Sequence, residues 1–136
     1  QMCIRDRYVM NISDLREARR FPDVVVHKAQ FVVDIHNPVG GGQANGIAEY
    51  VDAYDIPWRS LVPQKMENLI LAGRCISGTH EAMASYRVMA IAMAIGEAAG
   101  IGAALAIDHN VTPENLDVKY IQKALMDKGA VLFDEK

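Results

Sequence analysis

The segment at residues 85–107 limits the fold more than any other part of the chain, because it has almost no polar face. It reads SYRVMAIAMAIGEAAGIGAALAI, with Arg87 and Glu97 as its charged residues. A helix that is apolar on nearly every side must be surrounded by protein. The two charges leave charge-free runs only at 88–96 and 98–107, both shorter than the roughly 18 residues that a membrane span needs. We therefore expect a long buried helix and no membrane-spanning segment.

The composition excludes several classes of function. The chain has 136 residues and a net charge of -3, so no basic surface field is available to hold a nucleic acid. Its two cysteines, Cys3 and Cys75, form neither a disulfide framework nor a repeated zinc-ligand spacing. We therefore expect a cytoplasmic protein without a metal site. Residues 1–7 lack a secretory pattern and resemble a translated sequencing adapter, so we set them aside as a non-native artefact.

The first half of the chain has the pattern of a short helix followed by strands. Residues 11–20 predict a helix with Ser13 as a candidate N-cap, ended by Pro22. β-branched and aromatic residues predict three strands, at 24–26, 30–36 and 48–54. We expect the first two strands to be neighbours in a sheet.

Loops and a C-terminal helix complete the prediction. The glycines at 40–42 predict a loop that is either a flexible surface loop or one close to a ligand. The proline-bracketed segment 56–63 predicts an extended crossover between two layers. The long helix ends at 108–110, the next one starts at Thr112-Pro113-Glu114, and a final helix at 117–128 is ended by Gly129.

The short apolar run at 69–72, ended by Gly73, is typical of a strand buried on both faces of a parallel sheet. Open α/β sheets bind ligands at the carboxyl ends of their strands. The start of the following helix also offers unpaired amide donors that favour an anion. The same pattern occurs in purely structural turns. The dinucleotide fingerprint G-x-G-x-x-G is absent, since Gly100 and Gly102 lie inside the predicted helix.

Two stretches of the chain resemble a known family. They are YDIPWRSLVPQKMENLILAGRCISGTHEAMASYRVMAIAMAIGEAAG at residues 54–100 and FVVDIHNP at residues 31–38. Both resemble the C-terminal part of FAD-dependent oxidoreductases with the glutathione-reductase type of flavin fold, related to fumarate reductase flavoproteins. The resemblance covers most of residues 14–107, and its IPWRSLVP and LAGRCISGTHEA motifs are specific.

The resemblance implies an α/β fold that is a C-terminal fragment of a two-domain FAD-binding fold. Residues 8–60 would form part of a β-rich substrate domain and the crossover. Residues 61–110 would form the C-terminal part of the FAD-binding domain, with its last parallel strand and its long buried helix. Residues 111–136 would be a helical extension. The family's glycine-rich strand-turn-helix is not among these residues, so we expect most of the FAD site in a missing N-terminal part of the same chain.

The resemblance also implies where FAD would bind. Gly73 and Arg74 would pass beside the ribityl and pyrophosphate part, and residues 87–90 would face the pyrimidine edge of the flavin. Helix amides and a cation there would stabilise the negative charge of the reduced flavin. Many relatives have an acidic residue where this chain has Arg74, which cannot accept a hydrogen bond, so we expect it to donate to a phosphate or a carboxylate. The implied cofactor-binding residues are Gly73, Arg74, Cys75, Ser85, Arg87, Val88, Met89 and Ala90.

Several polar residues have both a structural and a functional interpretation. Arg87 is either a salt-bridge partner or a contact to flavin or substrate, and His80 is either a proton donor or a structural residue at a helix start. We take Arg87 and His80 as the candidate catalytic residues. Cys75 fits packing better than redox chemistry. His36 and Asn37 are candidates to line a substrate cavity.

Two functions remain open from the sequence. The chain is either part of an enzyme that transfers a hydride between FAD and a small organic substrate, or a non-catalytic packing or oligomerisation module. In both cases association with a second copy is open. Trp58 and Arg59 fit an anchor between layers, and core packing is expected of Met83, Met89 and Met93.

Overall fold

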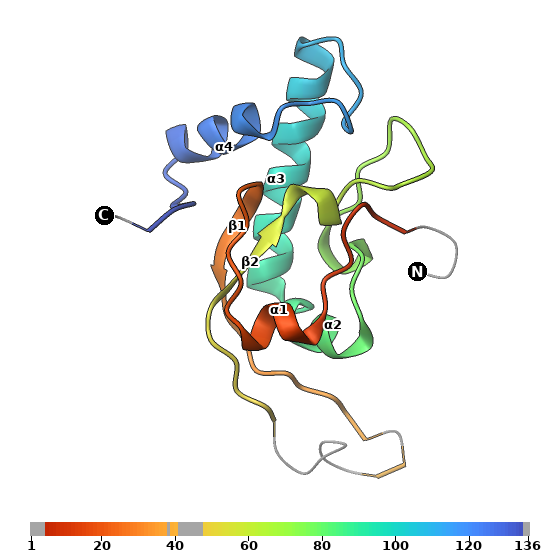
Figure 1. Ribbon diagram of the computed structural model, residues 1–136, viewed down its shortest axis with the longest axis vertical. Coiled ribbons are helices and arrows are strands. Elements are labelled where there is room, and N and C mark those ends of the chain that lie inside the picture. The colour runs from red at the N-terminus through yellow and green to blue at the C-terminus, as the bar shows by residue number, and fades with distance from the viewer. Residues whose placement is uncertain (1–4, 38, 41–47, 135–136) are drawn as a thin grey trace.

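The computed structural model describes residues 5–37, 39–40 and 48–134 (Figure 1). A two-stranded sheet lies at the centre, with a long helix along one side of it and shorter helices at both ends. This arrangement confirms the α/β class. The elements, in chain order, are α1 (Ile12–Arg16), β1 (Val24–Ala29), β2 (Tyr54–Pro57), two 3-10 turns at Trp58–Ser60 and Gly73–Cys75, α2 (His80–Tyr86), α3 (Met89–Asp108) and α4 (Val118–Asp127).

The central pair, β1 and β2, is antiparallel and irregular in register. Asp55 lies on β2, and its side chain is buried. Its carboxylate lies 3.3 Å from Nη1 of Arg20, in the segment that follows α1. Its carboxylate accepts a hydrogen bond from the Lys28 amide at 3.3 Å and lies 2.8 Å from His27 Nδ1. Lys28 has a φ of +53°, so the strand bends around this polar contact. The paired residues are Val24 with Pro57, Val26 with Ile56, and Ala29 with Tyr54.

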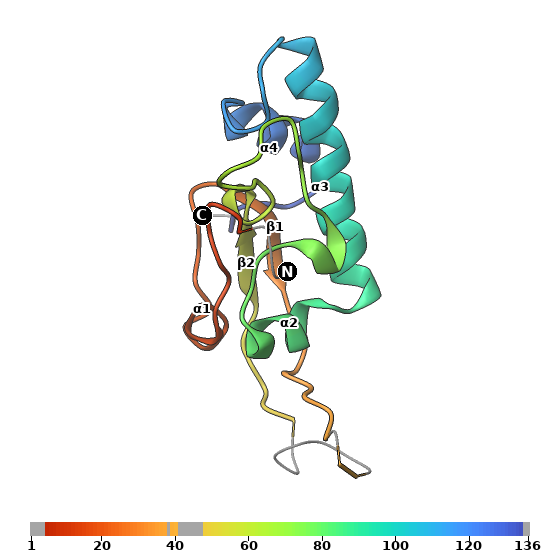
Figure 2. The same cartoon turned by 90° about the vertical axis from the view of Figure 1, so that its right-hand side faces the viewer.

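The prediction of a strand at 30–36 is wrong: the structure has no strand there. The prediction that this segment pairs with 24–26 is also wrong, because β1 pairs with β2. Segments 30–37 and 48–53 run side by side away from the body (Figures 1 and 2), but the described residues form an isolated bridge between Val33 and Glu49 and no continuous ladder. The Gln30 side chain also donates to the Tyr50 hydroxyl at 2.8 Å. The strand predicted at 48–54 begins only at Tyr54. These extended segments lack a second neighbour, so β-branched residues alone do not give a ladder. The predicted loop lies mostly outside the described residues, which exclude position 38 and positions 41–47.

The helix predicted at 85–107 is in fact two helices. Helix α2 ends with Arg87 as its C-cap, and Val88, with φ and ψ of -75° and 153°, is the extended N-cap of α3. The chain turns here because the last turn of α2 is fixed in the core. Tyr86 is fully buried beside Gly78, and burial raises the pKa of its hydroxyl.

Helix α3 packs on β1 through one face, and its other face is exposed in this chain. The buried face consists of Ile91, Ile95, Ala98, Ala99, Gly102 and Ala106. Met89, Met93 and Ile107 are 81%, 74% and 79% exposed. The prediction of a helix buried on all sides is therefore wrong for the described residues, and so is the assignment of Met89 and Met93 to the core. Met83 does pack partly against the core.

Contrary to the expectation from the sequence, the charge pattern does not exclude a membrane-spanning helix. Arg87 lies outside α3, which by length and composition alone is long and apolar enough to cross a membrane. This is weak evidence, because the core helix of a soluble protein passes the same test. We draw no conclusion about a membrane from it.

The run at 69–72 is extended but pairs with no strand among the described residues. Its residues are half-buried, and the Leu71 amide donates to the Leu61 carbonyl at 2.8 Å. The predicted parallel strand therefore has no neighbour here. Gly73 follows with a φ of +57°, a conformation that favours glycine.

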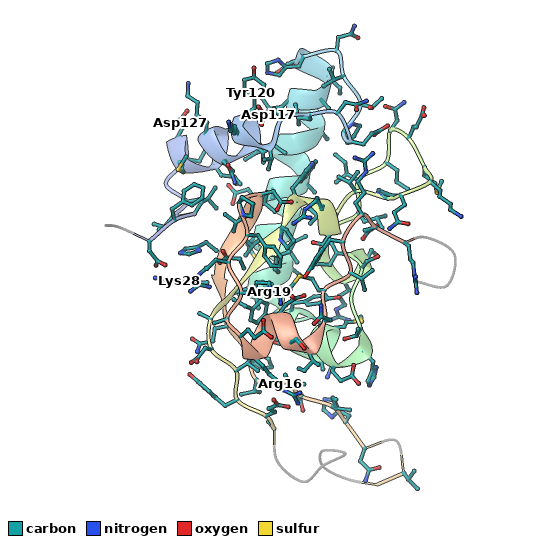
Figure 3. All side chains as sticks on the ribbon, in the orientation of Figure 1. Arg16, Arg19, Lys28, Asp117, Tyr120 and Asp127 are labelled. Atoms are coloured by element: carbon teal, nitrogen blue, oxygen red, sulfur yellow. The ribbon has the colours of Figure 1, made fainter. Side chains whose placement is uncertain are left out.

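Polar caps fix the terminal helices. Asn11, and not Ser13, is the N-cap of α1, where it forms a capping box with Asp14. The helix predicted to start at Thr112 is a turn, while α4 starts after its N-cap Asp117 and is followed by Gly129 with a φ of +95°. Figure 3 shows Asp117 and Asp127 at the two ends of α4.

Residues 5–7, set aside in the sequence analysis, pack into the described fold. The buried Asp6 accepts a hydrogen bond from the Ser77 amide at 2.6 Å, and its own amide donates to Ser77 Oγ at 2.9 Å. Burial raises the pKa of Asp6 to about 6, although the hydrogen bonds with Ser77 lower it. The Arg7 amide donates to the Val62 carbonyl at 2.8 Å. These contacts place residues 5–7 against the body of the molecule.

The first prediction concerns Gly102, at which α3 packs against the ring of Trp58. A Cβ at position 102 would overlap the ring of the buried Trp58. We expect Gly102→Ala to destabilise the chain by about 1–3 kcal/mol, because a packed ring must move. Urea denaturation followed by Trp58 fluorescence measures this directly, since Trp58 is the single tryptophan.

The matched control for that prediction is Gly100→Ala. Gly100 lies in the same helix with nothing within 4 Å of its added Cβ. Better helix propensity should leave this variant unchanged or stabilise it by up to about 1 kcal/mol. Equal effects of the two substitutions would show that Trp58 does not pack against Gly102.

The second prediction concerns Gln122, which attaches α4 to the sheet. It is buried, and its Nε2 donates to the carbonyls of Pro22 at 2.9 Å and Val24 at 3.1 Å. Gln122→Ala removes the donor to both carbonyls, of which that of Val24 is buried, so we expect a loss of about 1–3 kcal/mol in the free energy of unfolding. The exposed Lys123 on the same helix gives the control Lys123→Ala, which should change it by less than about 0.5 kcal/mol. Denaturation midpoints that fall equally in both variants would contradict the role of Gln122.

Candidate functional site

A cavity of about 320 Å³ lies between α2 and the segment at 34–36. Two of its residues were predicted as catalytic, Arg87 and His80, and a third, His36, was predicted to line a substrate cavity. The structure brings these three together, although they come from distant parts of the sequence. Asn37 does not line this cavity. The full lining is Asp34, Ile35, His36, His80, Met83, Ala84 and Arg87.

Arg87 and His36 are both held by Asp34. The Arg87 Nη2 donates to the Asp34 carbonyl at 2.8 Å and lies 3.7 Å from the Asp34 carboxylate. The same carboxylate oxygen, Oδ2, lies 3.1 Å from His36 Nε2. Arg87 thus makes the salt bridge of its structural interpretation while still lining the cavity. The sequence analysis missed Asp34, although an acid two positions before a histidine at the end of an apolar run was a signal that could have found it.

His80 is the first residue of α2 and is exposed. Thr79 caps this helix by accepting a hydrogen bond from the Ala82 amide at 3.4 Å. Hydrogen bonds from its own backbone amide and from the Thr79 hydroxyl lower the pKa of Glu81. Thr79 and Glu81 therefore stabilise the start of α2. The role of His80 as a proton donor stays a prediction.

A second group of predicted residues meets at the first turns of α3. The 3-10 turn at Gly73–Cys75 lies against this helix (Figure 2), and a Cβ on Gly73 would stand 3.9 Å from the Cβ of Ala92. Arg74 and Cys75 of this turn are exposed. The exposed Met89 and Ala90 form the first turn of the helix. Six of the eight residues implied for FAD gather here: Gly73, Arg74, Cys75, Val88, Met89 and Ala90.

Ser85 belongs to neither group, because its side chain is used in the core. It is fully buried, its Oγ donates to the Phe31 carbonyl at 2.6 Å, and the same oxygen lies 2.8 Å from the Tyr54 hydroxyl. Burial raises the pKa of Tyr54 to about 12, and the contact with Ser85 lowers it. The role of Ser85 in binding FAD stays a prediction, and any such contact would have to come from its backbone.

The start of α3 can stabilise negative charge. Its N-cap, Val88, has no side chain that accepts from the helix amides, and the first described backbone bond from this end runs from the Ala92 amide to the Val88 carbonyl. Uncapped amides at the N-terminus of a long helix carry a partial positive charge. Arg87 stands immediately before Val88, and its guanidinium is directed at Asp34 in the cavity. The cavity and the start of α3 are therefore joined along the chain at Arg87.

These features fit FAD at the positions that they cover. The exposed turn after Gly73 lets the main chain approach a ligand closely, and Arg74 can donate to a phosphate. Uncapped amides beside Arg87 suit a cofactor that gains negative charge on reduction. Within the described ranges, no group of three His, Cys, Asp or Glu residues is close enough to hold a metal ion.

A larger cavity of about 470 Å³ lies elsewhere, between the segment after α3 and the start of β1. Its wall includes Trp58 and Arg59. Trp58 Nε1 donates to the Pro113 carbonyl at 3.4 Å, and Arg59 forms two hydrogen bonds with the Asp23 carboxylate at 2.8 and 3.1 Å. These contacts agree with the prediction that Trp58 and Arg59 anchor two layers.

Comparison with known proteins gives one family. The model of the family described as FAD dependent oxidoreductase matches residues 4–125, which is most of the chain. Neither the curated proteins nor the solved structures give a match. The resemblance inferred from the motifs is confirmed: this chain belongs to the FAD-dependent oxidoreductase family.

Proposed function

We propose that these residues are the C-terminal part of an enzyme that transfers a hydride between FAD and a small organic substrate. The observation that carries the proposal is the adjacency at Arg87. Arg87, which lines a cavity with His36 and His80, comes immediately before Val88, the N-cap of the uncapped α3, and the start of α3 lies next to the Gly73 turn. Family membership supports FAD as the cofactor.

Each group has a distinct role in this proposal. FAD, when bound, supplies the hydride chemistry. The residues implied for it at the Gly73 turn and at the start of α3 hold it, and the amides of α3 stabilise negative charge. Arg87 adds a full charge at the same end and contacts the substrate. His80, exposed at the cavity wall, is the candidate proton donor to the substrate.

The rest of the cofactor site is proposed to lie in an N-terminal part of the same chain. Two observations support this proposal. The extended run at 69–72 has no strand partner among the described residues, and the outer face of α3 is apolar and exposed. A parallel sheet buried on both faces would cover them together. In this arrangement residues 8–60 belong to the substrate domain and residues 61–110 to the FAD-binding domain.

A second candidate function is supported by the same exposed face. Met89, Met93 and Ile107 are each at least 74% exposed, and Gly96 and Gly100 between them would allow close approach of another helix. A packing or oligomerisation module would use this surface without any cofactor. The two candidates differ in whether flavin is present.

The third prediction tests the cofactor on the chain alone. We expect the purified 136-residue chain to show no visible flavin absorbance, because only the Gly73 turn and the start of α3 contribute to the site. The same chain preceded by its upstream segment should purify with bound FAD. An absorbance spectrum before and after addition of a reductant measures both. Flavin on the short chain would contradict the division of the site, and its absence from the long chain would favour the packing module.

The fourth prediction concerns Gly73 in that longer, flavin-containing chain. At a φ of +57° an alanine costs about 1–2 kcal/mol, and its methyl group would stand in the turn implied to contact FAD. We expect Gly73→Ala to lower the ratio of bound flavin to protein. Gly129→Ala is the matched control, since Gly129 also has a positive φ, of +95°, but lies after α4. It should lose stability and keep its flavin, and equal flavin loss in both variants would refute a special role for Gly73.

A further inference from the structure

The segment that follows α4 turns back toward β1 (Figure 1) and brings the Asp134 carboxylate close to the ring of His27. We propose that residues 130–134 form a pH-sensitive strap: protonation of His27 gives its ring a hydrogen bond to Asp134 and so holds these residues against the sheet. The proposal does not depend on FAD or on the cavity beside α2. It assigns a conformational role to a cluster of charges that the proposed function does not use.

The first step is the position of the proton on the neutral His27 ring. The side chain is 3% exposed, and its Nδ1 lies 2.8 Å from Oδ1 of the buried Asp55. Asp55 also accepts from the Lys28 amide at 3.3 Å and from Nη1 of Arg20 at 3.3 Å. Its carboxylate therefore acts as an acceptor toward these neighbours. We accordingly assign the proton of the neutral ring to Nδ1.

The second step concerns the other ring nitrogen, Nε2. It is buried and forms no hydrogen bond within the described residues, and Oδ1 of Asp134 lies 3.5 Å from it. In the neutral ring Nε2 carries a lone pair, so two acceptors face each other and a buried polar atom stays unsatisfied. In the imidazolium form Nε2 carries a proton and can donate to Asp134. Protonation therefore changes an unfavourable contact into a favourable one.

The third step is to identify which group of the cluster titrates near neutral pH. Lys28 forms a salt bridge with Asp134, and this hydrogen bond lowers the pKa of the Asp134 carboxyl. Nε of Arg20 lies 3.9 Å from the same carboxylate. Asp134 therefore stays ionised, and both cations stay protonated, over the range in which histidine side chains change charge. The group of this cluster that responds to pH in that range is His27.

Two opposing effects decide the direction of the response. The docked strap brings a carboxylate to the ring, which favours a charged His27. It also shields the ring from water, which favours a neutral one. Because the nitrogen without a hydrogen bond faces the carboxylate directly, we expect the first effect to be larger. Above neutral pH the strap then keeps the salt bridge of Lys28 and the burial of Leu132 but loses the bond to the ring.

The experiment follows chymotrypsin cleavage of the purified 136-residue chain after Leu132 and Phe133, identified by mass spectrometry, at about pH 6 and about pH 8. Each rate is divided by the rate for a free peptide of residues 129–136 in the same buffer, so that the pH dependence of the protease cancels. Cleavage follows the population of released strap when release is fast. We expect the normalised rate to be about fivefold higher at the higher pH, the effect of an ion pair near the surface.

Three substitutions test the roles of the individual groups, each with a peptide of matching sequence. Asp134→Asn removes the carboxylate charge, so the difference between the two pH values should disappear. His27→Asn keeps a side-chain donor near Asp55 and cannot titrate, so it should also lose the difference. Lys28→Gln removes a salt bridge that does not depend on pH in this range. Its cleavage should be faster at both pH values while the difference remains.

The matched control is His109→Gln. His109 stacks on Tyr120 of α4, with 4.3 Å between the ring centroids, so it is a second histidine beside the helix that leads into the strap. This variant should keep the full difference. If His27→Asn does not fold, Asp134→Asn decides, because the Asp134 side chain is 55% exposed. A difference that survives in Asp134→Asn, or disappears in His109→Gln, overturns the proposal.

The unsubstituted chain gives two further tests. Equal normalised rates at the two pH values, or a faster rate at the lower one, would show that shielding from water outweighs the carboxylate and would refute the strap. The imidazole nitrogen shifts in NMR spectra report the position of the proton directly. A neutral His27 ring with its proton on Nδ1 supports the first step, and one with its proton on Nε2 overturns the proposal.

Discussion

The break between α2 and α3 is the constraint on which the rest of the site depends. A continuous helix through 85–107 would bond the amides of residues 89–91 to the preceding turn and leave none for a ligand. The extended Val88 ends that continuity. The break also places Arg87 at the last turn of α2, where it reaches the segment at 34–36. One change of direction therefore produces both the free amides and the position of the guanidinium.

The break is maintained by buried contacts of α2. Ser85 donates to the Phe31 carbonyl, and the ring of Tyr86 fills the space beside Gly78. Both residues precede Arg87 directly, so the end of α2 is fixed against two parts of the core. The long α3 packs elsewhere, on β1 and on the ring of Trp58. Because the two helices are fixed by different partners, a straight connection between them is not available.

Part of this structure follows from local sequence rules. The end of α3 at residues 108–110 and the end of α4 before Gly129 were predicted correctly, because capping and positive-φ glycines act within a few residues. The placement of Gly100 and Gly102 inside a helix was also correct. The motifs also identified the family, which the family model confirms. Rules that act over one helical turn therefore placed the ends of helices better than their starts, since Asn11 and not Ser13 caps α1 and the residues after Thr112 form a turn.

The errors that change the topology concern contacts between distant residues. The partner of β1 is β2, and not the nearby segment 30–36, because the pairing includes the buried Asp55 and its bonds to the first strand. Periodicity also missed the break at Val88, since apolar residues continue through it. It also missed the contacts of Asp34 with His36 and Arg87, because hydrophobic periodicity carries no information about polar side chains. Such contacts depend on how elements pack, which hydrophobic patterning does not specify.

The exposed faces have a physical meaning if the proposed function is correct. An apolar helix surface and an unpaired extended segment are both unfavourable in water, since one exposes hydrocarbon and the other exposes backbone groups. Here they lie next to each other, at α3 and at residues 69–72, with the Gly73 turn between them and the candidate cofactor residues on that turn. A sheet that covered both would bring its own strand ends to this turn. The surface that most needs a partner is thus the one at which the partner would complete the FAD site.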